Sequence, residues 1–229
     1  MCRRCSRWSR RVLARSYDGF CSLDWGFNAP FSCHWWVCLP DGRYHVCREW
    51  KEAGVYADEF AKEFWKITRQ DVGWTRPRYV VAGGDVDNKS GLRGEHGQSV
   101  KETLQRFGLP MKDADKSRKP GWYRVHELLG PSPYGTPWLT FDPSCKYILR
   151  TLPAAPRDKD DEDEVDPKFT DDHGIEDVRY GAMSRPSPTR YLEDRKADNP
   201  FQAGTLLKEA ILASTASPVL GAGNVRGAR

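Results

Sequence analysis

The sequence predicts an α/β domain with a mixed central sheet, in which three antiparallel strands are followed by parallel strands and helices cover both faces. The first observation is a run of three strand-like segments, at 19–25, 31–38 and 43–50, with a Pro-Asp-Gly turn signal between the last two. The second is the helical spacing of apolar residues over 56–70. The third is the alternation of short apolar segments with helical ones after residue 78. A strand meander that passes into alternating helices and strands is typical of a mixed α/β sheet.

Local patterns set the individual elements. Phe60, Phe64 and Ile67 recur every three or four residues, which predicts the helix over 56–70. Gly108 is expected to end the second helix, because glycine readily takes the left-handed conformation found at helix C-termini. The side chains of the Thr-Asp-Asp string at 170–172 are expected to cap the last helix, which runs to about residue 181. The other expected elements are strands at 78–82, 109–114 and 138–141 and helices at 98–107, 119–129 and 144–152.

The composition is that of a folded domain with polar ends. Of the 229 residues, 38% are hydrophobic, and nine each are Trp, Tyr and Phe, which is too aromatic for a disordered chain. We expect one domain over residues 17–185, preceded by a basic leader at 1–16 and followed by a flexible tail at 186–229. The formal net charge of +4 permits a polyanionic partner without requiring one.

Several classes of protein are excluded by what the sequence lacks. No apolar run approaches the ~20 residues needed to cross a bilayer, and no apolar segment follows the basic start as in a secretion signal. We therefore expect no membrane association and a cytoplasmic location. Cys2 and Cys5 form one C-x-x-C pair, but no second pair completes a zinc site.

Acidic residues stand where the predicted elements begin or end. Asp24 ends the first strand, Asp85 follows the fourth strand, and Asp171 and Asp172 open the last helix. If the first and fourth strands are neighbours, Asp24 and Asp85 share one sheet edge, and the last helix brings Asp172 over them. Carboxylates without His or Cys ligands suit a hard cation such as Mg²⁺ or Mn²⁺.

The residues around these acids resemble a known family. Residues 23–31, Leu-Asp-Trp-Gly-Phe-Asn-Ala-Pro-Phe, are similar to the first nuclease motif of the large terminase subunit of tailed bacteriophages. Residues 84–87, Gly-Asp-Val-Asp, with Asn-Lys-Ser-Gly after them, are similar to the second motif, with Val86 where proline is frequent. Residues 171–181, Asp-Asp-His-Gly-Ile-Glu-Asp-Val-Arg-Tyr-Gly, resemble the third motif, which usually reads Asp-His-x-x-Asp-Ala-Leu-Arg-Tyr. Glu176 replaces the second Asp of that motif, and Asp177-Val178 replaces Ala-Leu.

The resemblance implies an RNase H-like fold and a metal-dependent endonuclease that cuts concatemeric viral DNA during genome packaging. It implies that Asp24, Asp85 and Asp172 are catalytic metal ligands and that Asp171 and Glu176 are further ligands. The implied cofactor is Mg²⁺ or Mn²⁺, as two ions that together activate water and stabilise the leaving oxygen, so no protein nucleophile is required. The expected location is then the cytoplasm of a bacterial host that carries the phage or prophage.

The implied partners are double-stranded DNA, the small terminase subunit and the portal. No Gly-x-x-x-x-Gly-Lys-Ser/Thr string occurs, so we expect the ATPase motor to be separate from this chain or missing from it. The candidate phosphate contacts are Lys89 and Arg93, just after the second motif, and the later cluster of Lys116, Arg118 and Lys119.

Other residues receive structural interpretations. Trp25, Trp35 and Trp36 are interpreted as core residues in preference to base-stacking platforms. His173 is interpreted as a helix-start residue in preference to a general base. The acidic stretch 158–164 is expected to be a solvated loop that repels DNA.

Two alternatives stay open. One is another RNase H-like nuclease, such as a Holliday junction resolvase or a transposase, although these lack the Trp-Gly-x-x-x-Pro continuation after the first acid. The other is a non-catalytic module that docks DNA or the portal, which the Glu176 replacement weakly favours.

Overall fold

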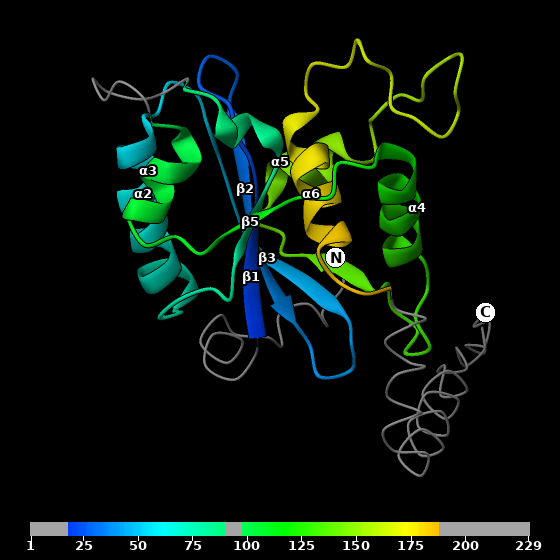
Figure 1. Ribbon diagram of the computed structural model, residues 1–229. Coiled ribbons are helices and arrows are strands. Elements are labelled where there is room, and N and C mark those ends of the chain that lie inside the picture. Colours follow the sequence, from blue (N-terminus) through cyan, green and yellow to red (C-terminus); the bar gives the residue numbers. More distant parts are fainter. Residues whose placement is uncertain (1–17, 90–97, 188–229) are drawn as a thin grey trace, which may run out of the picture.

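Six strands form a central sheet in the order β5-β4-β1-β2-β3-β6 in the computed structural model, which describes residues 18–89 and 98–187 (Figure 1). The strands β1 (Asp18–Asp24), β2 (Phe31–Cys38) and β3 (Tyr44–Glu52) are antiparallel, as the sequence predicts. The three short strands β4 (Val80–Ala82), β5 (Met111–Asp113) and β6 (Leu139–Phe141) pair in parallel at the two sides of this meander. The predicted mixed α/β sheet is therefore confirmed.

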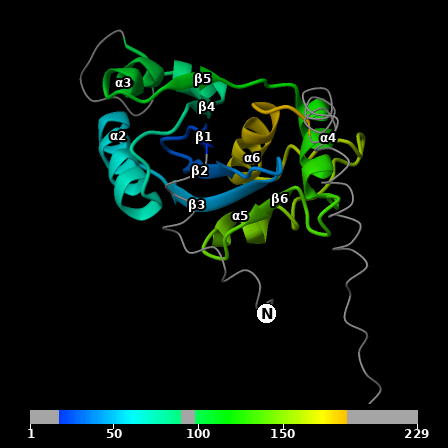
Figure 2. The same cartoon turned by 90° about the horizontal axis from the view of Figure 1, so that it is seen from below.

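Helices cover both faces of the sheet (Figure 2). The helices α2 (Ala57–Lys66) and α3 (Val100–Arg106) pack on one face, and α4 (Arg118–Leu129), α5 (Lys146–Thr151) and α6 (His173–Met183) pack on the other. Successive side chains of β2 point to opposite faces of the sheet, so this strand contributes to the hydrophobic core on each face. Trp35 packs in the core under α2, and Trp36 packs in the core under α6. Both rings are fully buried, as is nearly all of Trp25, so the interpretation of these residues as core is confirmed.

The segment 56–70 differs from the single helix that its spacing predicts. The α-helical part α2 ends at Lys66, and a π-helix, η2 (Ile67–Val72), continues to Gly73, whose φ is 82°. The hydroxyl of Thr68 donates a 2.7 Å hydrogen bond to the Phe64 carbonyl and accepts one from Trp35 Nε1 at 3.0 Å. A side-chain hydroxyl that bonds to a backbone carbonyl of the preceding turn often accompanies a change from α-helical to π-helical hydrogen bonding.

The expected side-chain cap of the last helix is wrong. Asp172 is the N-cap residue of α6, but its carboxylate makes no capping hydrogen bond. Its backbone carbonyl accepts from Glu176 N at 2.9 Å, while the carboxylate of Asp171 is held by Lys51 and Arg150. Gly108 does follow its helix with a φ of 84°, so that prediction is confirmed.

Residues 1–16 of the expected leader and 188–229 of the expected tail lie outside the described residues. Within the part of the chain that the structure describes, no helix is both long enough and apolar enough to cross a membrane.

The helix α6 is the most deeply buried element on its face of the sheet. Every residue from 174 to 182 is buried, and the helix contacts β1, β2 and β4 of the sheet as well as α4 and α5. Gly181 allows this close approach, because a methyl group in its place would overlap the indole ring of Trp36.

Gly181→Ala is therefore expected to destabilise the domain by ~1–3 kcal/mol through overpacking. Helix propensity alone gives the opposite sign, since alanine is favoured over glycine by about 1 kcal/mol inside a helix. Urea unfolding of the variant and the wild type measures the difference, and a more stable variant would contradict the close packing of α6 on Trp36.

Candidate functional site

Parallel pairing of β1 with β4 places two of the candidate acids at one edge of the sheet. Asp24 is the last residue of β1, and β4 runs through Gly83 into the short 3₁₀ helix η3 (Gly84–Asp87), which carries Asp85. The backbone N–H of Gly83 donates to the Leu23 carbonyl at 3.2 Å, so the two strand ends are in contact. The prediction that the first and fourth strands are neighbours is confirmed.

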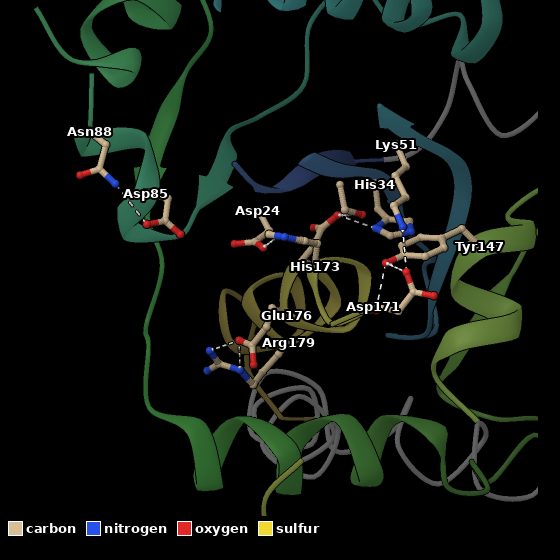
Figure 3. A network of polar contacts seen from close by, with 12 residues as sticks. Asp24, His34, Lys51, Asp85, Asn88, Tyr147, Asp171, His173, Glu176 and Arg179 are labelled. Carbon is tan, nitrogen blue, oxygen red and sulfur yellow. Dashed lines mark hydrogen bonds and ion pairs between the residues drawn. The ribbon is translucent and has the colours of Figure 1, made fainter. Parts of the chain in front are cut away.

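Glu176 of α6 is close enough to Asp24 for its charge to act on that carboxyl. Figure 3 shows Asp24 of β1 bonded to His173, Glu176 of α6 bonded to Arg179 and Asp85 of η3 bonded to Asn88. The ring of Tyr180 lies against the backbone of Gly83. Burial raises the pKa of the Tyr180 phenol, and the charges of Asp24, Glu176 and Asp85 raise it further. The three carboxylates differ in their surroundings, because Asp24 and Glu176 are nearly buried and Asp85 is exposed.

Asp24 is nearly inaccessible to solvent, with 5% of its surface exposed. Burial raises the pKa of its carboxyl to about 6, against the opposing effect of His173, and the charges of Asp177 and Glu176 add to the increase. His173 Nδ1 lies 2.6 Å from Asp24 Oδ2. This hydrogen bond raises the pKa of His173 above its ordinary value. His173 is the first residue of α6, as interpreted from the sequence, but its contact with Asp24 was missed.

Glu176 is held by two arginines. Its Oε2 accepts from Arg179 Nε at 2.9 Å and Nη2 at 2.5 Å, and its Oε1 accepts from Arg118 Nη1 at 3.0 Å. Arg179 is almost fully buried and also donates to the Ser117 carbonyl at 3.1 Å. These guanidinium groups balance the charge of a carboxylate that is only 7% exposed.

The other predicted acids are placed differently. Asp171 accepts from Lys51 Nζ at 3.2 Å and from Arg150 Nη2 at 3.0 Å, and it lies beyond His173 from Asp85 in Figure 3. Burial opposes its ionisation, but these two cations lower the pKa of Asp171 below its ordinary value. Asp172 is partly buried at the start of α6, and its charge acts on His173. Within residues 18–89 and 98–187, no three His, Cys, Asp or Glu side chains are close enough together to hold a metal ion.

The predicted phosphate contacts fall into two groups. Lys116 lies directly over Gly84, next to Asp85, where a β-carbon on residue 84 would overlap its ammonium group. Arg118 and Lys119 are paired with acids of the 158–164 stretch: Arg118 Nε with Glu164 at 2.8 Å and Lys119 Nζ with Asp161 at 2.7 Å. The stretch 158–164 is an irregular segment at the surface, as the sequence predicts, and two of its acids pair with cations of α4. Lys89 is exposed after η3, and Arg93 lies outside the described residues.

Comparison with known proteins identifies the fold. The sequence matches no protein-family model and no curated protein. The structure is similar to the full large terminase of a thermophilic bacteriophage, with a TM-score of 0.58 and 17% identity over 76% of this chain and 40% of that one. It is also similar to the nuclease domain of the P22 large terminase, with a TM-score of 0.55 and 17% identity over 79% of this chain and 91% of that one. The chain has the fold of a large terminase nuclease domain.

A third similar structure is the large terminase nuclease of the thermophilic phage G20c with bound cobalt, at a TM-score of 0.50 and 12% identity over 74% of this chain and 82% of that one. The predicted RNase H-like fold is thereby confirmed. The chain spans about two fifths of the first of these large terminases and most of the P22 nuclease domain.

The terminase-like fold contains a buried charged network that the sequence did not indicate. Asp177 is fully buried, and its Oδ2 lies 2.6 Å from Nδ1 of His34 on β2. Nε2 of His34 lies 3.2 Å from Glu49 on β3. Burial by itself lowers the pKa of His34, but the charge of Asp177 and hydrogen bonds to Asp177 and Glu49 raise it to about 9. The one available signal was Asp177 itself, which stands where the third motif usually has alanine.

Stability is expected to depend on the pH through His34. Its folded-state pKa of about 9 lies above its ordinary value of 6.5, so proton binding stabilises the fold. This contribution is complete below about pH 6.5 and is lost as the pH rises through about 9, at a cost of at most about 3 kcal/mol. Urea unfolding between pH 6 and pH 9.5 measures the loss. The double variant His34→Gln with Asp177→Asn, which leaves no buried charge, is expected to flatten the profile, and an equally steep profile in that variant would assign the loss to other groups.

Proposed function

We propose that this chain is the metal-dependent endonuclease domain of a phage large terminase, which cuts concatemeric viral DNA during packaging. The observation that carries the proposal is the pairing of β1 with β4, which places Asp24 and Asp85 at one edge of the sheet in a fold shared with solved terminase nuclease domains. Glu176 of α6 is close enough to Asp24 for its charge to act on that carboxyl. The three sequence motifs that resemble this family contain Asp24, Asp85 and Glu176 in turn.

The chemistry of the donors fits a hard divalent cation. The carboxylate oxygens of Asp24, Asp85 and Glu176, and of Asp172 at the start of α6, are the ligand type that Mg²⁺ and Mn²⁺ prefer. The G20c nuclease of the same fold has bound cobalt. Two bound ions would supply the positive charge that activates water and stabilises the leaving oxygen of a phosphodiester. Asp171, which pairs with Lys51 and Arg150, is the weakest of the predicted ligands.

The protein's own cations have a defined part in such a site. His173 contacts Asp24, while Arg118 and Arg179 contact Glu176. Clustered carboxylates repel one another, and these side chains reduce that repulsion. A metal cation that binds the acids competes with His173 and Arg118 for the same oxygens.

The DNA contacts we propose follow the placement of the basic residues. Lys116 lies over Gly84, next to Asp85, and Lys89 and Arg93 follow the Gly-Asp-Val-Asp string of the second motif. Arg118 and Lys119 reach phosphates only by exchanging their present carboxylate partners, Glu164 and Asp161. Contacts of this kind position a duplex without reading its sequence.

The wider setting of the proposal is the packaging machine of a phage or prophage in the host cytoplasm. Its partners there would be double-stranded DNA, an ATPase motor, the small terminase subunit and the portal. A non-catalytic docking module is the second candidate, favoured by the pairing of both Glu176 oxygens with arginines. Plasmid cleavage separates the two.

Asp85→Asn is expected to reduce metal-dependent plasmid cleavage by about 100-fold or more, because bound metal contributes several kcal/mol to phosphodiester cleavage. Wild type should nick or degrade plasmid with Mg²⁺ or Mn²⁺ and not with EDTA. Asp58→Asn makes the same charge change on α2, where Asp58 pairs with Lys62 at 3.0 Å, and is expected to cleave normally. A folded wild type that cleaves with neither metal would leave the docking module as the better interpretation.

Lys116→Ala is expected to weaken duplex binding about threefold to tenfold and to lower the slope of log binding constant against log salt by about 0.9. The reason is the loss of one phosphate contact beside Asp85. Fluorescence anisotropy with a labelled duplex at several salt concentrations, in Ca²⁺ to prevent cleavage, gives both quantities. Lys62→Ala, on α2, is the control, and an equal loss there would mean that net charge alone sets the affinity.

A further inference from the structure

A line of buried polar side chains crosses the sheet beneath α6. Asp177 Oδ2 accepts from Ser32 Oγ at 3.0 Å and from His34 Nδ1 at 2.6 Å. His34 connects to Glu49, whose two oxygens accept the backbone N–H groups of Tyr147 at 2.8 Å and Ile148 at 2.7 Å. The line therefore joins α6 through β2 and β3 to the first turn of α5, and Figure 3 shows the part around His34.

Stability alone does not account for this network. Buried ion pairs lose hydration that their mutual attraction only partly replaces, and apolar replacements of similar volume are often neutral or stabilising. Burial of Asp177 costs additional folding free energy, because its Oδ1 has no hydrogen-bond partner among the described residues. Buried polar groups with such a cost can instead specify one arrangement of packed elements.

One end of the network lies next to Asp24 of the candidate site. Ser32 is directly opposite Asp24 in the pairing of β1 with β2, so Ser32 ties Asp177 to the strand position beside Asp24. Asp177 is also close enough to Asp24 for its charge to act on that carboxyl. Successive side chains of an α-helix are about 100° apart, so the direction of Asp177 sets the direction of Glu176.

We infer that Ser32, His34 and Asp177, backed by Glu49, are positioning residues that fix the rotation and height of α6 and so hold Glu176 in register with Asp24 for divalent-metal binding. The inference rests on the proposed nuclease function. In the proposed nuclease, Glu176 would contact the metal in exchange for its arginine partners, and the network would act only through Glu176. Its replacement is expected to change metal affinity rather than to remove a reacting group.

The test compares Mn²⁺ affinity, measured by isothermal titration calorimetry, and the Mn²⁺ concentration for half-maximal plasmid cleavage. The double variant His34→Leu with Asp177→Ala removes the charge pair without leaving either charge buried alone, and both quantities are expected to weaken about tenfold or more. His34→Gln with Asp177→Asn restores a hydrogen-bonded connection without charge. It is expected to recover most of the affinity.

Ser32→Ala is a milder variant that remains informative if the leucine–alanine pair does not fold. It removes one buried hydroxyl bond to Asp177 and is expected to weaken Mn²⁺ binding about threefold. Thr68→Val is the matched control, because it removes a buried hydroxyl bond to a residue of β2 on the opposite face of the sheet. It is expected to lower thermal stability while leaving Mn²⁺ affinity unchanged.

The outcomes separate the two proposals. Wild-type Mn²⁺ affinity in the folded leucine–alanine variant, or equal effects of Ser32→Ala and Thr68→Val, would overturn the positioning role and leave the nuclease intact. A folded wild type that neither binds Mn²⁺ nor cleaves DNA would overturn the nuclease, and the positioning role with it.

Discussion

The rest of the structure depends on how α6 buries its charged side chains. The helix brings Glu176, Asp177 and Arg179 into the interior, where an unpaired charge costs several kcal/mol. Each is therefore matched: Glu176 with Arg179 and Arg118, and Asp177 with His34. These pairs bind α6 to α4 on one side and to β2 on the other, so the polar contacts of one helix fix the arrangement of the whole face.

The same constraint shapes the candidate site. The acids at the sheet edge stand among histidine and arginine side chains that the fold itself provides, so their negative charge is partly balanced. A cation that enters must displace some of these partners, and a phosphate that approaches α4 must displace the acidic loop. Competition between internal ion pairs and external ions is thus built into this face of the molecule.

The similarity to terminase nuclease domains, at 17% identity or less in the three structures compared, shows how loosely this fold constrains its core residues. Sheet order and helix placement depend on the pattern of apolar positions, which many sequences satisfy. Asp177, which stands where the third motif usually has alanine, is accommodated because His34 lies beside it. One without the other would leave a buried charge.

The sequence by itself determined the mixed sheet, the succession of helices and the positions of Asp24 and Asp85 at strand ends. These follow from local periodicity and turn residues, which act over a few neighbours along the chain. Only the tertiary structure decided that His173 contacts Asp24, that Glu176 rather than Asp171 lies with the other acids, and that His34 pairs with Asp177. It also decided that two acids of the stretch 158–164 pair with Arg118 and Lys119. Those contacts join residues far apart in sequence, and the direction of each side chain depends on the rotation of α6, which packing and buried charge set together.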